Sequence, residues 1–201
     1  RLSFYLSCDY AVTDDDGDFS EHGLFGMDEI GDIYVTDWWS GQTAPDTWIN
    51  AAFALIRRHR PQIWFEEKGV ILRAVDGAIT KAMREQNTFV HREPLPSAGN
   101  KAARALGFAA RASAGTIWLP KEQEWAVRLL NQLCSFNGQD GKVDDMVDVC
   151  SLLARGLDEM TNARPEPAAK KDPPKPFTQA WFDARDKMDK GDETSKAKYY
   201  R

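Results

Sequence analysis

The sequence has little cysteine, with only three such residues among 201. Cys8, Cys134 and Cys150 are too scattered for a disulfide framework, and neither a C-x-x-C pair nor a Cys/His cluster suggests a zinc site. No apolar run reaches the length of about eighteen residues that a membrane span needs, and the first residues do not begin a signal peptide. These absences predict a protein of a reducing compartment without a transmembrane helix.

Three further features are missing. The formal net charge is -5 and the pI is near 5.3, which excludes a protein that coats nucleic acid through an overall positive field, so any contact with DNA must be local. No G-x-x-x-x-G-K-[ST] loop is present, so ATP hydrolysis is not predicted. The chain does not begin with methionine, which suggests a piece of a longer protein or a processed chain.

The sequence does contain short apolar runs that alternate with segments of helical periodicity. Runs rich in aromatic and β-branched residues predict strands, and apolar residues recurring every three or four positions predict helices. The predicted strands cover 2–9, 21–27, 32–39, 62–67, 88–91 and 116–120, and the predicted helices cover 45–59, about 69–86, 100–113, 122–136 and 144–157. Three strands in a meander followed by alternating helices and strands indicate an α/β layered domain with a mixed sheet.

The composition changes abruptly at residue 161, where Ala, Pro, Lys and Asp replace the apolar residues. Such a segment cannot bury a core. We therefore expect one domain over 1–160 and a linker and tail over 161–201, in which 177–188 has enough amphipathic character for a turn or two of helix.

Acidic residues stand where three of the predicted elements end or begin. Asp9 ends the first strand, Glu66 and Glu67 end the fourth, and Asp144, Asp145 and Asp148 open the last helix. Carboxylates that a fold gathers together repel one another and lose solvation, so a cation normally neutralises them. Oxygen ligands without Cys or His favour Mg²⁺ or Mn²⁺, and two such ions about 3.5–4 Å apart can stabilise both the attacking water and the leaving oxygen of a phosphodiester.

Each acid also has an ordinary structural explanation. Asp9 taken alone is typical of a turn, the Glu pair of a solvated strand end, and Asp144 and Asp145 of the positive end of a helix dipole. The order of the acids along the chain favours the metal site over these explanations. On a helix Asp144 and Asp148 share a face while Asp145 points about 100° away. We expect Asp148 and one of the two preceding acids to face the metals, and the other to cap the helix.

Five short motifs carry a resemblance to a known family. They are Ser7-Cys8-Asp9-Tyr10-Ala11, Ile63-Trp64-Phe65-Glu66-Glu67-Lys68-Gly69, Asn100-Lys101-Ala102-Ala103-Arg104-Ala105, Gly115-Thr116-Ile117-Trp118-Leu119-Pro120 and Asp144-Asp145-Met146-Val147-Asp148. In this order and spacing, the chain resembles the nuclease domain of the large terminase subunit of tailed bacteriophages over about residues 4–158.

The resemblance implies an RNase H-like fold in which a strand-one Asp, a central-strand Glu and a late Asp hold Mg²⁺ or Mn²⁺. By matching position, these catalytic residues are Asp9, Glu66, and Asp144 or Asp145. Many relatives carry His or Gly before the late Asp pair, where this chain has Lys142-Val143, and the central Glu is doubled here. The second ligand is therefore Glu66 or its neighbour Glu67, and the third is Asp144 or Asp145.

Most of the basic residues in the middle of the chain are typical of solvated helix surfaces. Three of them, Lys68, Lys101 and Arg104, are predicted to contact DNA. Lys68 adjoins the Glu pair, and Lys101 and Arg104 lie in the N-K-x-x-R-A string of the third motif. Phosphates can be guided past the acids by such a local set without a basic protein.

The resemblance also implies a function, an endonuclease that cuts duplex DNA with weak sequence specificity during viral genome packaging in the host cell cytoplasm. Its implied partners are double-stranded DNA, an ATPase motor domain of the same parent chain, a portal and a small terminase subunit. Two other functions fit the acids. One is a different RNase H-like nuclease, such as a junction resolvase or a transposase core; the other is a non-catalytic docking domain of a packaging motor.

Overall fold

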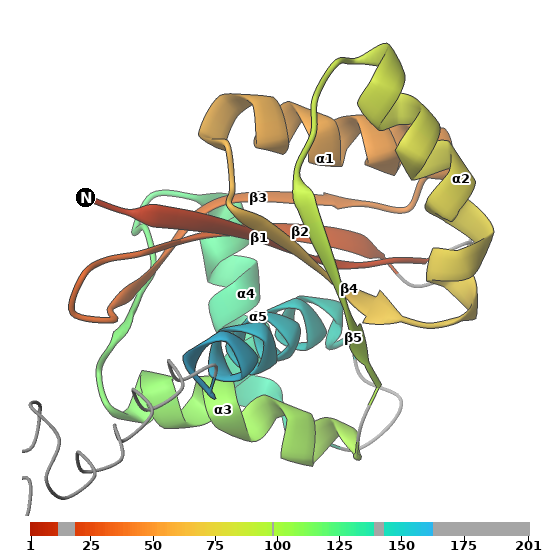
Figure 1. The fold of residues 1–201 in the computed structure, drawn as a ribbon. Coiled ribbons are helices and arrows are strands. Elements are labelled where there is room, and N and C mark those ends of the chain that lie inside the picture. Colours follow the sequence, from red (N-terminus) through yellow and green to blue (C-terminus); the bar gives the residue numbers. More distant parts are fainter. Residues whose placement is uncertain (12–18, 98, 139–142, 163–201) are drawn as a thin grey trace, which may run out of the picture. The chain divides into compact units, whose positions relative to one another are not determined.

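A mixed sheet of six strands forms the centre of the protein, whose computed structural model describes residues 1–11, 19–97, 99–138 and 143–162 (Figure 1). The side chains of 161 and 162 are not described, and residues Arg1–Asn162 form one compact unit. Residues 163–201 of the tail expected over 161–201 lie outside the described residues. No helix of the described part is long and apolar enough to cross a membrane.

The strands lie in the order β5-β4-β1-β2-β3-β6 across the sheet. Their bounds are β1 Ser3–Asp9, β2 Ser20–Met27, β3 Ile33–Gly41, β4 Ile63–Lys68, β5 His91–Pro96 and β6 Ile117–Trp118. The first three pair antiparallel, which confirms the meander predicted from the sequence. β4 is parallel to both β1 and β5, and β6 is parallel to β3, so the sheet is mixed as predicted.

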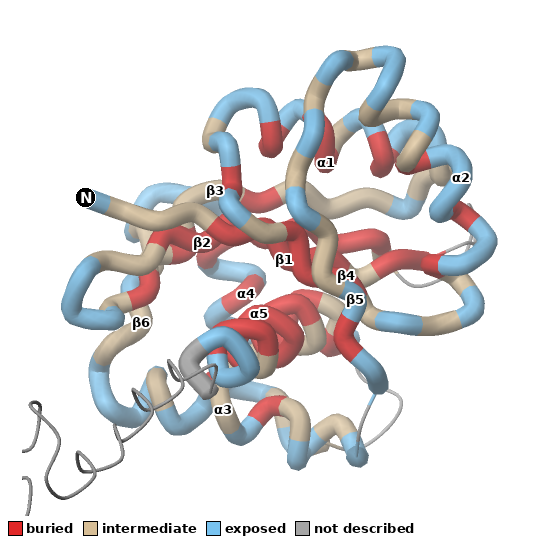
Figure 2. Tube along the Cα trace, in the orientation of Figure 1, coloured by how far each residue is buried: buried red, intermediate tan, exposed pale blue. Residues whose placement is uncertain are grey.

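In the described part of the chain, five helices cover the two faces of the sheet. They are α1 Pro45–His59, α2 Val70–Glu85, α3 Lys101–Ser113, α4 Glu124–Ser135 and α5 Asp145–Asn162. In Figure 1, α1 and α2 lie on one side of the sheet, and α3, α4 and α5 lie on the other. Each side has its own apolar core, and the buried segments in Figure 2 run through the sheet and α5.

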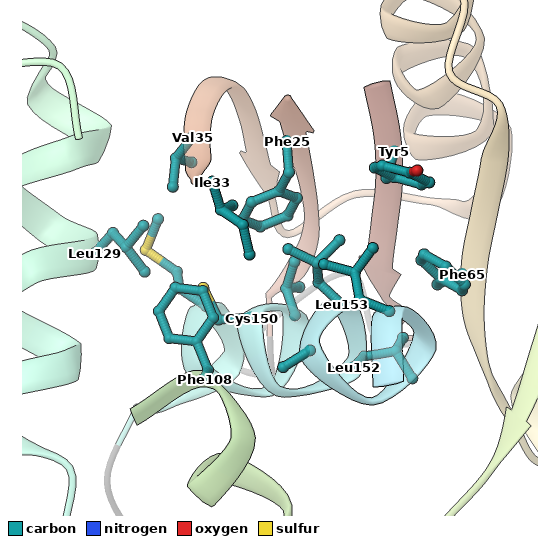
Figure 3. Packing of buried hydrophobic residues seen from close by; sticks show 14 of the residues in the cluster. Tyr5, Phe25, Ile33, Val35, Phe65, Phe108, Leu129, Cys150, Leu152 and Leu153 are labelled. Carbon is teal, nitrogen blue, oxygen red and sulfur yellow. The ribbon is translucent and has the colours of Figure 1, made fainter. Parts of the chain in front are cut away.

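Helix α5 packs directly on the sheet. Its apolar residues at helical spacing are buried, as the sequence predicts: Met146, Val149, Cys150, Leu153 and Leu157. Gly156 allows the close approach, because a Cβ there would come within 2.4 Å of the Phe65 ring on β4. The Ser7 hydroxyl of β1 also donates a hydrogen bond of 2.9 Å to the Val149 carbonyl. Figure 3 shows this packing between the strands and α5.

The strand predicted at 88–91 is wrong in its bounds, because the structure has β5 at His91–Pro96. The sequence did not predict a strand over these residues because it contains Pro94 and Pro96, and proline disfavours a central strand. β5 is the outermost strand on its side of the sheet, and an edge strand tolerates proline because its outward N–H positions need no partner.

Candidate metal centre

Asp9 and Glu67 lie side by side on one face of the sheet. β1 and β4 run parallel with Cys8 opposite Glu66, so the next residue of each strand, Asp9 and Glu67, points to the opposite face. That face is the one that α5 covers, since Tyr5 and Phe65, which share it, belong to the core beneath α5. The ends of two neighbouring parallel strands thus supply two carboxylates to one place.

The beginning of α5 brings further carboxylates to the same place. A small hollow of about 10 Å³, room for one water-sized sphere, is lined by Asp9, Glu67 and Asp148 together with Arg104. Asp145 lies close enough for its charge to raise the pKa of Asp9. The structure therefore brings together Asp9, Glu67, Asp145 and Asp148, four of the acids singled out in the sequence.

The charges of this cluster disturb one another. Burial raises the pKa of Asp9 well above its usual value, and the nearby charges of Asp148, Asp145 and Glu67 raise it further. Burial also raises the pKa of Asp148, although the positive charges of Lys101 and Arg104 oppose that rise. Such a set of desolvated carboxylates favours a bound cation.

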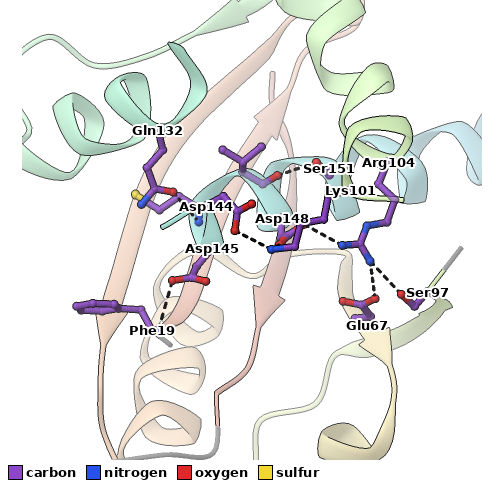
Figure 4. Close-up of polar contacts among 12 residues, drawn as sticks. Phe19, Glu67, Ser97, Lys101, Arg104, Gln132, Asp144, Asp145, Asp148 and Ser151 are labelled. Atoms are coloured by element: carbon purple, nitrogen blue, oxygen red, sulfur yellow. Dashed lines mark hydrogen bonds and ion pairs between the residues drawn. The ribbon is translucent and has the colours of Figure 1, made fainter. Parts of the chain in front are cut away.

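Two basic residues of α3 already hold part of the cluster (Figure 4). The Lys101 ammonium lies 2.8 Å from Asp144 Oδ1 and 3.4 Å from Asp148 Oδ2. The Arg104 guanidinium lies 3.1 Å from Glu67 Oε1 and 3.2 Å from Asp148 Oδ1. Both residues predicted to contact DNA from this helix therefore pair with the acids instead of pointing into solvent.

The two acids at the start of α5 have different surroundings. Asp144 precedes the first helical residue, and its carbonyl accepts hydrogen bonds from Val147 and Asp148 N–H groups while its carboxylate is bound to Lys101. Asp145 accepts a hydrogen bond of 3.4 Å from the backbone N–H of Phe19. The charge of Asp145 raises the pKa of Asp9.

Glu66 is not brought together with Asp9. Its side chain is 1% exposed and lies on the other face of the sheet, where Arg92 binds it at 2.6 Å through Nε and at 3.0 Å through Nη2. The Tyr10 hydroxyl donates a third hydrogen bond of 2.6 Å to it. Arg92 in turn pairs with Asp76 of α2 at 2.7 Å. The structure thus corrects the expected placement of Glu66 in the cluster, because successive residues of a strand face opposite ways.

Lys68 lies at the rim of a second, larger hollow. This hollow has a volume of about 180 Å³ and is lined by Asp9, Glu67, Lys68 and the first residues of α2, among others. Lys68 itself is exposed. It therefore lies beside the acids, as expected.

Glu21 is a neighbour of the cluster that the sequence analysis missed. It stands opposite Asp9 in the β1–β2 ladder and is 2% exposed. Its carboxylate accepts hydrogen bonds from Trp38 Nε1 and from the Ser40 hydroxyl, and burial raises its pKa to about 7. The sequence placed Glu21 at the start of a strand, and only the pairing register shows that it shares a face with Asp9.

The residues present fit a hard divalent cation. All candidate ligands of the cluster are carboxylate oxygens, which Mg²⁺ and Mn²⁺ prefer. The negative charges of Asp148, Asp145 and Glu67 raise the pKa of Asp9, and a bound cation would relieve that repulsion. Among the described residues, no three Asp, Glu, His or Cys side chains stand ready to hold one ion together as they are placed. A metal ion would therefore need side chains of the cluster to turn toward it.

Comparison with known proteins gives the fold. No protein-family model matches the sequence, and no curated protein matches it. Among solved structures, the human cytomegalovirus terminase nuclease domain, soaked with Mn, superposes with a TM-score of 0.56 at 13% identity, covering 81% of this chain and 84% of that one.

Two bacteriophage proteins are also similar. The large terminase nuclease of thermophilic phage G20c with bound zinc gives a TM-score of 0.53 at 16% identity, over 75% of this chain and 79% of that one; a structure with bound magnesium matches as well. The large terminase of a second thermophilic bacteriophage gives 0.55 at 12% identity, and the matched part is 77% of this chain but 40% of that one. The chain has an RNase H-like fold, and its resemblance to terminase nuclease domains is confirmed in three dimensions.

Proposed function

We propose that the chain is a metal-dependent nuclease that cuts duplex DNA. The observation that carries this proposal is the convergence of Asp9, Glu67, Asp145 and Asp148 from the ends of β1 and β4 and the start of α5. The repulsion among these carboxylates destabilises the protein. Such a costly arrangement is expected where the carboxylates must bind a cation for function. Similar folds, one soaked with manganese and others with bound zinc or magnesium, support this proposal.

In this proposal Asp9, Glu67 and Asp148 hold the divalent ions, with Asp145 and Asp144 completing the set from α5. Glu67 takes the role that the sequence suggested for Glu66. Bound ions of this kind lower the pKa of a water molecule and stabilise the charge that develops on phosphodiester oxygens. Mg²⁺ or Mn²⁺ is the expected ion, and two ions are expected because the cluster offers more carboxylates than one ion needs.

The protein's own residues position the cluster. The Ser7 hydroxyl binds the carbonyl of Val149, in the second turn of α5, to β1, and the apolar core beneath α5 fixes the helix on the sheet. The acids of α5 are thereby held over the ends of β1 and β4. Lys68 at the rim, together with Lys101 and Arg104, would contact the phosphates of the DNA backbone.

The test compares two Asp variants of the protein. Asp9→Asn removes one ligand charge with almost no change in volume, so it should abolish cleavage of supercoiled plasmid in Mn²⁺ while the protein stays folded. Asp158→Asn is the matched control, because Asp158 lies near the far end of α5, is half exposed and pairs with Arg111. It should cut like the wild type. Cleavage by the Asp9 variant at the wild-type rate would refute the proposal.

We further propose a setting in viral DNA packaging, as part of a longer chain that also carries an ATPase motor. The support is the likeness to terminase nuclease domains and to the second phage's large terminase, of whose length the matched part is 40%. A portal and a small terminase subunit would then be its partners in the host cell cytoplasm. Preference for linear duplex over four-way junctions in the cleavage assay separates this setting from a junction resolvase.

A further inference from the structure

Lys101 and Arg104 stand three residues apart on α3, so both point from one face of the helix into the acidic cluster. Between them they make four ion pairs with three carboxylates, those of Glu67, Asp144 and Asp148. The Arg104 side chain is 13% exposed and that of Asp148 is 16% exposed. The Arg104–Asp148 pair is therefore shielded from water, and shielding makes it stronger than an ordinary surface pair.

The same carboxylates are the ones that the proposed function needs for metal ions. A carboxylate oxygen that accepts a hydrogen bond from a guanidinium or an ammonium group has lost much of its capacity for a metal. Glu67 and Asp148 line the hollow beside Asp9, and Arg104 bridges the two. Asp9, by contrast, forms no ion pair with any basic residue among those described.

We infer that Lys101 and Arg104 set the metal affinity of the cluster, because they compete with the metal ions for Glu67 and Asp148. The inference rests on the proposed function, which places the ions among these acids. The two basic residues neutralise part of the negative charge of the cluster when no metal is bound, and their ion pairs with the carboxylates must break before an ion can bind. Metal binding is therefore weaker than the acids alone would make it.

A consequence follows for DNA. Once released, the Lys101 ammonium and the Arg104 guanidinium can bind phosphates, which are good partners for both groups. DNA that holds these two side chains removes the competitor of the metal. By linkage, DNA and metal must then strengthen each other's binding, so the cluster fills with metal when its substrate is present.

The ion pairs are not needed to hold α3 in place. Ala105 and Phe108 of α3 are buried, and Gly107 lies against Ala154 of α5, where an added Cβ would be 3.4 Å from the alanine methyl. The Asn100 side chain caps the helix by accepting a hydrogen bond from Ala103 N–H. Variants of Lys101 and Arg104 should therefore fold.

The experiment measures Mn²⁺ binding by isothermal titration calorimetry, without DNA. Lys101→Met and Arg104→Met keep the aliphatic bulk and remove the charge, and Arg111→Met is the control, because Arg111 lies on the same helix but pairs with Asp158. Each of the first two variants should bind Mn²⁺ roughly tenfold more tightly than the wild type, and the control should not differ. In EDTA the Arg104 variant should melt below the wild type, and Mn²⁺ should raise its melting temperature by more.

Unchanged or weaker Mn²⁺ binding by both variants would overturn the inference. Asp9→Asn separates this failure from failure of the proposed function. If the wild type binds Mn²⁺ and the Asp9 variant does not, the metal site stands and only the competition is refuted. If neither the wild type nor the Arg104 variant binds Mn²⁺, both ideas fall.

The coupling to DNA is measured with Ca²⁺, another ion that prefers oxygen ligands, and a short blunt duplex. The duplex should tighten Ca²⁺ binding to the wild type several-fold. The same duplex should have little effect on Ca²⁺ binding by the Lys101→Met/Arg104→Met double variant. Equal tightening in both proteins would refute the release of the two side chains to phosphate.

Discussion

Glu66→Gln should lower the stability of the protein without changing metal binding, whereas Glu67→Gln should weaken metal binding with little change in stability. Glu66 accepts two hydrogen bonds from Arg92 and one from Tyr10. Gln offers one acceptor oxygen, so at least one of these bonds is lost along with the charge. A hydrogen bond to a charged group contributes about 1.5–3 kcal/mol, and breaking a buried ion pair costs about 3–5 kcal/mol.

Arg92 keeps a second partner in Asp76, at 2.7 Å, so the loss should lie closer to the hydrogen-bond figure than to the ion-pair figure. We expect Glu66→Gln to lower the free energy of unfolding by about 2–3 kcal/mol, which corresponds to a fall in melting temperature of roughly 4–12 °C for a domain of this size. Mn²⁺ binding should be unchanged at a temperature where the variant is folded.

Glu67→Gln should behave in the reverse way. The Glu67 side chain is 32% exposed and forms one ion pair, with Arg104, so its loss should change stability by less than about 1 kcal/mol. Loss of a residue that only hydrogen-bonds a metal ligand typically weakens metal binding about 10–100-fold. Because Glu67 is proposed to bind the metal directly, its loss should weaken Mn²⁺ binding at least as much. Thermal denaturation and Mn²⁺ calorimetry measure both effects. A Glu66 variant of normal stability that no longer binds Mn²⁺ would refute the assignment of the two faces.

Three further predictions concern the fold. Burial lowers the pKa of His22 to about 4, so between about pH 6.5 and 4 the unfolded chain binds a proton that the folded chain does not bind. The free energy of unfolding should therefore fall by about 3 kcal/mol over this pH window. Urea titrations should show a smaller fall for His22→Gln. Gly156→Ala should destabilise by about 1–3 kcal/mol through contact with Phe65, whereas Gly77→Ala, with open space around it, should stabilise α2 slightly. Removal of 163–201 should leave the melting temperature unchanged.

Much of the fold could be predicted because its patterns contrast polar with apolar positions. The apolar residues of α5 recur at helical spacing from Met146 to Leu157, and all of them are buried. The meander of β1 to β3 was visible from three separate apolar runs. The order of the elements then sufficed for the fold class, since few arrangements accommodate a meander followed by alternating helices and strands.

The candidate site was harder to predict, because β4 is covered on both faces. Trp64 and Phe65 are both fully buried, so alternation along this strand shows no contrast that would reveal which of the next two residues faces Asp9. The register with β1 decides it, and register depends on contacts between residues far apart in the sequence. The same holds for Glu21 and for the pairing of Arg104 with the acids.

The two outer strands of the sheet also determine what can be added to it. β5 carries Pro94 and Pro96, and β6 at the opposite edge consists of two residues. Proline has no N–H to offer a further strand, so β5 gives an incoming chain little to pair with. β6 pairs only with Ile33 and Tyr34 and leaves the rest of β3 without an outer strand among the described residues. The domain should consequently resist strand pairing with copies of itself at the β5 edge, and the β3 side is the edge where such pairing could begin.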